Sequence, residues 1–333
     1  MPASARTPTA CLRIGTRGSP LALVQAEEAL ARLVLTQPAL GKPGAAEIVV
    51  IKTTGDRILD RPLAEVGGKG LFTKEIDEAL LDGRVDLAVH SVKDLPTWLP
   101  APIILAATLS REDPRDALIA PGFETIAALP EGCVVGTSSL RRQAQLLHRR
   151  PDLSIVPLRG NVATRLRKVA DGTVGATLLA MAGLNRLEKM GRLDAAADLG
   201  TGNSDQAIHP VAAEQMLPAA GQAAIGITCR EDDEAVRMLL AAVDDRRTHL
   251  CVAAERAMLT VLDGSCRTPI AALAVVDDDL ATLRICGLIA RPDGTRLIAE
   301  RRRGDADDAQ RLGRDLGEAL RAEGGAGFFA PAG

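Results

Sequence analysis

The sequence predicts an α/β protein made of two successive units of alternating strands and helices, followed by a small α+β unit. Short β-branched runs alternate with amphipathic helical stretches in the first part of the chain, and a similar pattern restarts after a hinge-like stretch at 112–116. From about residue 234, two helical runs precede strand-like segments and a last helix, which is typical of a small domain with an antiparallel sheet. The expected domains are 1–110 with 222–242, then 111–221, and finally 243–333.

The first unit begins with a strong helix signal. A strand is expected at 12–14, and Ser19 with Pro20 then opens a helix to about residue 35, because serine is a favoured N-cap and proline a favoured first helical residue. The other elements expected here are a buried strand at 48–51, a helix at 73–81 closed by Gly83, and a strand at 85–89.

The second unit repeats this order. A strand at 133–135 precedes a helix from Leu140 to about His148, capped by residues 137–139. Further elements are expected as a strand at 153–156, a helix at 162–170, a strand at 176–179, a surface excursion at 195–206, and a late strand at 223–228 that returns to the first sheet. From residue 234 onwards, the chain is expected to have helices at 234–243 and 249–262, strands at 270–276, 282–290 and 296–301, and a helix at 307–322.

Composition argues against several classes of function. Hydrophobic residues make up 47% of the 333 residues but aromatic residues only 2%, so the core must consist of Leu, Val, Ile and Ala. Few aromatic faces for base stacking and a net charge of −3 argue against a nucleic-acid partner. No apolar run reaches the ~20 residues that cross a bilayer, and the first residues do not resemble a signal peptide, so a cytoplasmic protein without a membrane partner is expected. The six cysteines lack the spacing of a disulfide framework or a zinc site, and no metal is expected.

Two strand-to-helix corners carry the same anion-binding chemistry, and a third adds to it. Helix N-termini offer free N–H groups and partial positive charge, and the guanidinium fork of arginine fits carboxylates and phosphates. Each corner alone could be an ordinary N-cap beside solvated arginines, but matching corners in successive units favour one site in a cleft between facing domains. The polar residues of the three corners are Arg17 and Ser19, then Ser139, Arg141 and Arg142, and finally Arg159 and Arg165.

Residues 90–94 form another dense polar cluster. This His-Ser-Val-Lys-Asp run follows a strand that is apolar through Val89, so Lys93 and Asp94 are expected at the ligand-binding edge of the sheet. Asp94 could handle protons or stabilise a cationic intermediate beside Lys93, whereas the alternative is a surface ion pair of little energetic consequence. His90 is expected to be a buried, hydrogen-bonded histidine rather than a catalyst.

Two loops complete the candidate site. Cys266 lies in a loop between a helix and a strand, where Gly264 allows a tight turn and Arg267 favours the thiolate, so this thiol is a candidate for covalent attachment. Residue chemistry alone leaves attachment and a neutral role equally open. The glycine-rich stretch at 55–70, which contains Lys69, is either a lid or an ordinary loop.

Taken together, these motifs resemble those of the porphobilinogen deaminase family, whose members are also called hydroxymethylbilane synthases. HSxKDxP, GTSSLRR and RGNxxTR with a late Gly-x-Cys are specific in combination, although each is weak alone. The sequence departs from the family pattern at Ser265, at Ala223 after Gln222, where glycine is common, and in a longer excursion before Leu217. The matching segments run from residue 13 to beyond residue 270 and are TRGSPLAL, GGKGLFTKEI, AVHSVKDLP, REDPRDA, VGTSSLRRQAQ, LRGNVATRL, LLAMAGLNRL, LPAAGQAAIGI and AAERAML-x4-GSCRTPI.

This resemblance implies an enzyme that links four porphobilinogen molecules head to tail, with release of ammonia, into the linear tetrapyrrole hydroxymethylbilane. It also implies a dipyrromethane cofactor that is made from porphobilinogen and attached through the Cys266 thiol. Asp94 would be the central catalytic carboxylate, with Lys93 beside it. By the same resemblance, Lys93, Asp94, Ser139, Arg141 and Arg142 would hold the cofactor, Arg17, Ser19, Arg159, Arg165, Arg186 and Gln222 would bind the substrate and the growing chain, and Lys69 would belong to the lid.

The resemblance further implies a monomer with three domains. Two α/β domains would be like those of periplasmic binding proteins, with a cleft between them, and a small α+β domain would carry the cysteine loop on an antiparallel sheet. A different class of function would be a non-catalytic anion-binding module of the periplasmic-binding-protein type, which explains the two units and the arginines but leaves Cys266 idle. An enzyme that has lost its cofactor is a further alternative, although Cys266, Lys93 and Asp94 are all present.

Overall fold

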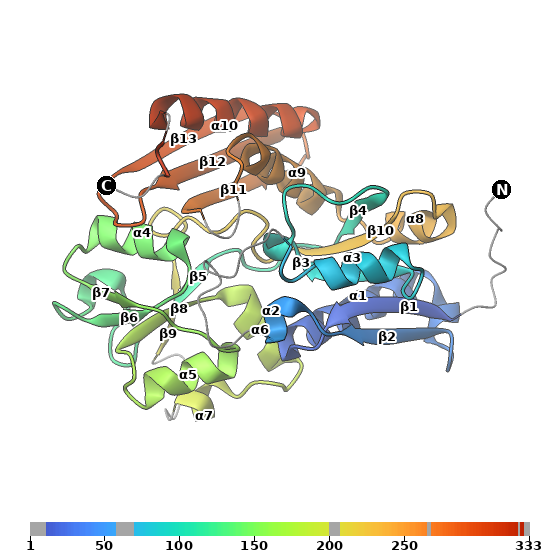
Figure 1. The fold of residues 1–333 in the computed structure, drawn as a ribbon, viewed down its shortest axis with the longest axis horizontal. Helices are drawn as coiled ribbons and strands as arrows, with labels where there is room; N and C mark the ends of the chain where they lie inside the picture. Colours follow the sequence, from blue (N-terminus) through green and yellow to red (C-terminus); the bar gives the residue numbers. More distant parts are fainter. Residues whose placement is uncertain (1–10, 58–69, 200–206, 265–267, 326, 330–333) are drawn as a thin grey trace.

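The computed structural model describes residues 11–57, 70–199, 207–264, 268–325 and 327–329, arranged around three sheets (Figure 1). Sheet A has the spatial order β2 (Ala46–Ile51), β1 (Leu12–Arg17), β3 (Leu87–Ser91), β10 (Ile225–Arg230) and β4 (Ile103–Thr108). Sheet B has the order β7 (Ser154–Val156), β6 (Val134–Gly136), β8 (Ala176–Ala180), β5 (Asp116–Ile119) and β9 (Ile208–Val211). Sheet C is antiparallel, with the order β11 (Ile270–Val276), β12 (Thr282–Ala290) and β13 (Leu297–Asp305). The expected fold class is confirmed.

Each sheet is accompanied by its own helices. Along the chain segments of sheet A these are α1 (Pro20–Thr36), α2 (Thr54–Arg57), α3 (Lys74–Leu81) and α8 (Glu234–Ala241). The helices of the sheet B segments are α4 (Leu140–Arg149), α5 (Val162–Ala170), α6 (Met181–Lys189) and α7 (Ala195–Leu199), and sheet C is covered by α9 (Arg246–Val261) and α10 (Ala309–Gly324) (Figure 1). Short 3₁₀ turns lie at η1 (Pro38–Gly41), η2 (Val92–Asp94), η3 (Ile126–Ala128) and η5 (Ala306–Asp308). Across the described ranges, no helix combines the length and the apolar character required to cross a membrane.

Sheets A and B have the same topology. In each, three parallel strands are followed by one strand that runs the other way and then by an edge strand. The reversed strands, β10 and β5, are the ones that the chain enters after crossing from the other sheet, through residues 212–224 and 109–115 respectively. The predicted return of the late strand to the first sheet is therefore confirmed. The two crossovers place both sheets around one junction.

Three helices begin with a capping residue just after the carboxyl end of a parallel strand, as the sequence predicted. The side chain of Ser19 accepts the N–H of Ala22 at the start of α1, and Ser139 accepts the N–H of Arg142 at the start of α4. Asn161 caps α5 in the same way. These caps satisfy backbone donors that a helix N-terminus otherwise leaves free, and they fix where the following polar side chains begin.

Several sequence expectations are wrong in detail. The stretch at 195–199, expected as a surface excursion, is the helix α7, which packs on α5 and buries Ala195 and Leu199; residues 200–206 lie outside the described ranges. Alanines satisfy a helix as readily as a polar loop, so composition misled there. The strand at 46–51 is an edge strand and half-buried rather than buried. Strand β5 begins inside the stretch predicted as a hinge.

Small aliphatic side chains build the core, as composition required. Clusters lie on both faces of sheets A and B, and two smaller clusters join the third domain to the others. One of these packs Val92 of η2 against Val252 of α9, and the other packs Ala144 of α4 against Leu288 of β12. The third domain therefore supports both segments that carry candidate site residues.

Candidate active site

The carboxyl end of β3 leads directly into the segment that carries Lys93 and Asp94. Its last buried side chain, His90, has Nε2 3.0 Å from Thr228 Oγ1. Burial, and then the nearby charge of Arg17, lowers the pKa of His90 to about 4, so the imidazole is neutral at ordinary pH. This confirms the expectation of a buried, hydrogen-bonded histidine. The next turn is fixed by Val92, which is buried and donates its N–H to Ala224 O at 3.0 Å.

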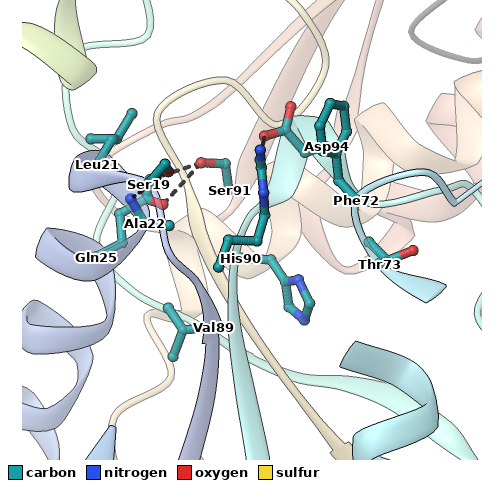
Figure 2. A pocket seen from close by; sticks show the side chains of 11 residues that line it. Ser19, Leu21, Ala22, Gln25, Phe72, Thr73, Val89, His90, Ser91 and Asp94 are labelled. Atoms are coloured by element: carbon teal, nitrogen blue, oxygen red, sulfur yellow. Dashed lines mark hydrogen bonds and ion pairs between the residues drawn. The ribbon is translucent and has the colours of Figure 1, made fainter. Parts of the chain in front are cut away.

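A pocket opens beside Asp94 on the first domain (Figure 2). Arg17 Nη1 lies 3.8 Å from Asp94 Oδ2, and the guanidinium carbon of Arg17 lies 4.2 Å from the centroid of the Phe72 ring. Figure 2 shows Phe72 and Asp94 on one side of the pocket, with Ser19 and Gln25 on the other. The pocket wall therefore carries a carboxylate and a guanidinium, with the guanidinium stacked on the Phe72 ring.

The second domain contributes two arginines held by one buried carboxylate. Asp116, the first residue of β5, is 0% exposed and accepts Arg141 Nη1 at 2.8 Å on Oδ2 and Arg142 Nη2 at 2.7 Å on Oδ1. Burial alone would raise the pKa of Asp116, but the two guanidinium groups lower it well below its usual range. Arg142 Nη1 also donates to Leu178 O, whereas its buried Nε has no partner among the described residues. This donor remains for a bound anion.

Gln222 connects the two domains at this junction. Its Nε2 donates to Asp116 Oδ1 at 2.9 Å and to Pro114 O at 2.8 Å, and its Oε1 accepts Lys93 Nζ at 3.4 Å. Burial lowers the pKa of Lys93 to about 8, with Asp94 opposing this shift and Arg142 adding to it. A chain of hydrogen bonds thus links Lys93 on one domain, through Gln222 and Asp116, to the arginines on the other.

Two more arginines extend the positive field. Burial, and then the nearby charges of Arg142 and Arg159, lowers the pKa of Arg165 to about 10. Arg165 Nε donates to Gly160 O at 2.9 Å. Besides Arg17, five cations among the described residues gather here near the two carboxylates Asp94 and Asp116, an excess that suits a small ligand with several carboxylates. The cations are Lys93, Arg141, Arg142, Arg159 and Arg165.

Arg186, expected to bind substrate, is engaged elsewhere. It is only 5% exposed, and it pairs through Nε with Glu28 Oε2 at 2.9 Å and donates from Nη1 to Ala223 O at 3.1 Å. It therefore joins α6 of the second domain to α1 of the first. Ala223 itself has a φ of +73°, in the left-handed region that favours glycine. This conformation explains why the resembling family commonly has glycine there.

Two predicted site residues lie outside the described residues. They are Cys266, in the segment between α9 and β11, and Lys69, in the segment before α3. The described cysteines are free thiols. Burial raises the pKa of Cys229 to about 11 and of Cys251 to about 12, so these two thiols are unreactive at neutral pH, as the sequence suggested.

Sequence reasoning missed several residues of this site. Gln25 and Ser91 exchange hydrogen bonds between their side chains on the pocket wall, and Phe72 stacks on Arg17. Asp116 was counted only as part of a hinge-like stretch. Its signal was available, because an acidic residue directly before the apolar run 117–119 needs a cationic partner if it is buried as part of the strand.

Fold and site together define a class: a two-lobed α/β protein with a third domain and a cation-rich site beside one exposed carboxylate, Asp94. Residues 12–238 match the family model "Porphobilinogen deaminase, dipyromethane cofactor binding domain", and residues 249–322 match "Porphobilinogen deaminase, C-terminal domain". The chain belongs to the porphobilinogen deaminase family.

Relatives named porphobilinogen deaminase are similar over nearly the whole chain. The protein from Paracoccus denitrificans is 52% identical over 318 residues, covering 96% of each chain. The chloroplastic protein of Pisum sativum is 50% identical over 324 residues, covering 96% of this chain and 84% of the pea protein. Among solved structures, a periplasmic substrate-binding protein from Coxiella burnetii gives a TM-score of 0.38 at 18% identity, covering 70% of this chain and 91% of that one. An ABC transporter/periplasmic binding protein from Brucella ovis gives 0.40 at 14%, covering 76% and 69%.

Proposed function

We propose that this protein is a hydroxymethylbilane synthase of tetrapyrrole biosynthesis, which condenses four porphobilinogen molecules head to tail with release of ammonia. The observation that carries the proposal is the cation cluster around Asp116 and Lys93, set beside Asp94, in a chain of this family. Each pyrrole of the substrate bears two carboxylates. A site that keeps several such units bound during elongation requires an excess of guanidinium and ammonium donors.

The described residues fit the dipyrromethane cofactor that the family model names. Its two pyrroles together carry four carboxylates, and Arg142 retains a buried Nε donor that has no partner among the described residues. Lys93, Asp94, Ser139, Arg141 and Arg142 are proposed to hold the cofactor, with Cys266 as its attachment point. When bound, the cofactor supplies the pyrrole to which the first substrate is joined.

Asp94 is proposed as the central catalytic group. Loss of ammonia from the protonated aminomethyl group of porphobilinogen leaves a protonated azafulvene, whose positive charge a nearby carboxylate offsets. The side chain of Asp94 is 39% exposed and lies at the pocket wall, where it can contact a bound pyrrole. Lys93, which is positively charged below its pKa of about 8, would pair with a substrate or cofactor carboxylate beside it.

The remaining polar residues of the site are proposed to bind the incoming substrate and the growing chain. These residues are Arg17, Ser19, Arg159, Arg165 and Gln222, with Lys69 in the lid. Arg186 stays a prediction as a substrate ligand, although its pairing with Glu28 favours a role in joining the two domains. The protein is further proposed to act as a cytoplasmic monomer, which light scattering and cell fractionation test.

Product analysis tests this function directly. The purified protein should consume porphobilinogen and release one ammonia for each unit joined, with hydroxymethylbilane as the product in a ratio of four units to one. Cys266→Ser should release no ammonia, because it lacks the attachment point. Saturable binding of porphobilinogen without ammonia release by the unmodified protein would instead support a non-catalytic anion-binding module.

A further inference from the structure

Asp116 is a buried carboxylate to which the proposed mechanism gives no part. Its two oxygens receive three side-chain donors, from Arg141 at 2.8 Å, Arg142 at 2.7 Å and Gln222 at 2.9 Å. These partners come from α4 and from the crossover 212–224, and Asp116 itself follows the crossover 109–115. A buried ionic network of this kind is tolerated only when its geometry is well satisfied, so its arrangement is fixed rather than incidental.

The charge on Asp116 also determines which way the Gln222 amide faces. Gln222 Nε2 donates to Asp116 Oδ1 and to Pro114 O, and both of these oxygens can only accept hydrogen bonds. The amide oxygen of Gln222 must therefore face the other way, where it accepts Lys93 Nζ at 3.4 Å. A carboxylate on the second domain thus sets the hydrogen-bond acceptor for a lysine on the first.

The same carboxylate orients the two arginines. Arg141 Nη1 is shared between Asp116 and Leu217 O at 2.8 Å, and Arg142 is held at both terminal nitrogens by Asp116 and Leu178 O. With those nitrogens fixed, the guanidinium plane of Arg142 is fixed as well. Its buried Nε is the guanidinium nitrogen that has no partner in the part of the chain that the structure describes. Removing the charge of Asp116 would free both guanidinium groups to turn.

We propose that Asp116 is a positioning residue for the cofactor site: it fixes Arg141 and Arg142 and, through Gln222, Lys93 in the arrangement that binds the carboxylates of the first two pyrrole units. This inference rests on the proposed function. By this proposal, one buried charge at the start of β5 orients the cations of both α/β domains.

The test compares Asp116→Asn with a matched control, Asp86→Asn. Asp86 is also buried and also pairs with an arginine, Arg13, at 2.9 Å, but it lies at the amino end of β3, away from the site. Each protein is prepared without cofactor from cells that make no porphobilinogen and then incubated with porphobilinogen. The two-pyrrole adduct is followed by intact mass. Asp116→Asn should form it at least about tenfold more slowly than the unsubstituted protein, and Asp86→Asn at a rate within about twofold.

A second readout separates positioning from general loss of stability. In the cofactor-free protein, Lys93 faces Asp94 of η2, Asp116 of β5, and Arg141 and Arg142 of α4. Losing the negative charge of Asp116 should lower the pH at which Lys93 gains reactivity towards an amine-acylating reagent, measured by peptide mass mapping. Asp86→Asn should leave that pH unchanged even where it lowers the melting temperature.

Each outcome decides between specific statements. The inference would be overturned if Asp116→Asn folds, forms the adduct at the control rate, and leaves the pH midpoint of Lys93 acylation unchanged. If Asp116→Asn does not fold, Gln222→Met carries the test, since it removes the link to Lys93 but keeps the buried charges. Gln222→Met that forms the adduct at the unsubstituted rate would then contradict the inference. Failure of the unsubstituted protein itself to gain an adduct would contradict the proposed function, and the inference with it.

Discussion

Asp94 and Lys93 are neighbours in sequence but have different surroundings. Asp94 faces the pocket beside Arg17 and Phe72, whereas Lys93 points towards Gln222 and the arginines of the second domain. A 3₁₀ turn between the strand and Leu95 produces this divergence, because successive residues of such a turn point in different directions. In the proposed function, Asp94 therefore acts on the reacting pyrrole, while Lys93 contacts bound carboxylates.

Asp94→Asn tests the proposed role of this side chain as the catalytic carboxylate. The substitution keeps the shape of the side chain but removes the charge proposed to offset the azafulvene, so kcat should fall at least about 100-fold with the unfolding midpoint nearly unchanged. Asp152→Asn is the control, since Asp152 pairs with Arg150 beyond the other end of α4. Near-normal turnover by Asp94→Asn would remove Asp94 from the mechanism.

The lowered pKa of Lys93 predicts how the affinity of the site for carboxylates depends on pH. Below about pH 8 the ammonium is charged and attracts carboxylates, and above that pH it is neutral. The affinity of the cofactor-free Cys266→Ser protein for porphobilinogen should therefore fall as the pH rises through 8, as measured by calorimetric titration. Lys93→Met should bind more weakly at pH 7 and lose this step, and an identical pH profile in both proteins would contradict the assignment.

The third domain holds the two crossovers, residues 109–115 and 212–224, in place. Glu255 of α9 is 0% exposed, and its Oε1 accepts Arg111 Nη1 at 2.7 Å and Ala274 N at 2.7 Å. Its Oε2 accepts Gly221 N at 2.6 Å and Arg111 Nη2 at 3.2 Å. Because Arg111 and Gly221 belong to the two different crossovers, one carboxylate holds both, and the Gln222 side chain is positioned by the same junction.

Glu255→Gln should therefore be strongly destabilising. It leaves the charge of Arg111, itself mostly buried, without its partner, and removing one member of a buried pair costs about 3–5 kcal/mol in free energy of unfolding. Urea denaturation measures this loss. Asp278→Asn, which breaks the exposed pair with Arg247, should change the free energy by less than about 1 kcal/mol. Equal effects of the two substitutions would show that the junction is not held by this pair.

In the whole molecule, the two α/β domains also touch through α1 and α6. Arg186 pairs with Glu28 there, and Arg192 pairs with Glu27 further out on the surface. Leu21 and Val24 of α1 pack into the core cluster of the second domain. This second contact and the crossovers together hold the two sheets in a common arrangement around the site.

Arg186→Met distinguishes a domain contact from a substrate ligand. If Arg186 joins the domains, the substitution should lower the free energy of unfolding by about 2 kcal/mol, since Glu28 is partly solvated, and should raise KM only modestly. Arg192→Met, at the more exposed pair on the same contact, should have a smaller effect. A large rise in KM for porphobilinogen at unchanged stability would assign Arg186 to substrate binding instead.

Much of this architecture follows from local sequence signals. The helix α5 and the strands β11 and β12 have the predicted bounds, because caps, turns and apolar runs mark their ends. The convergence of Asp116 with Gln222 and Arg141 could not be predicted, since these residues are 106 and 25 positions away from it along the chain. Such contacts depend on how two sheets meet across the crossovers, which residue patterns within one element do not encode.

The measurement that tests the central claim most directly is the intact mass of the purified protein beside that of Cys266→Ser. The account predicts an excess equal to two pyrrole units on the unsubstituted protein and none on Cys266→Ser. Freshly prepared, folded protein without this excess, which also gains none on incubation with porphobilinogen, would contradict it.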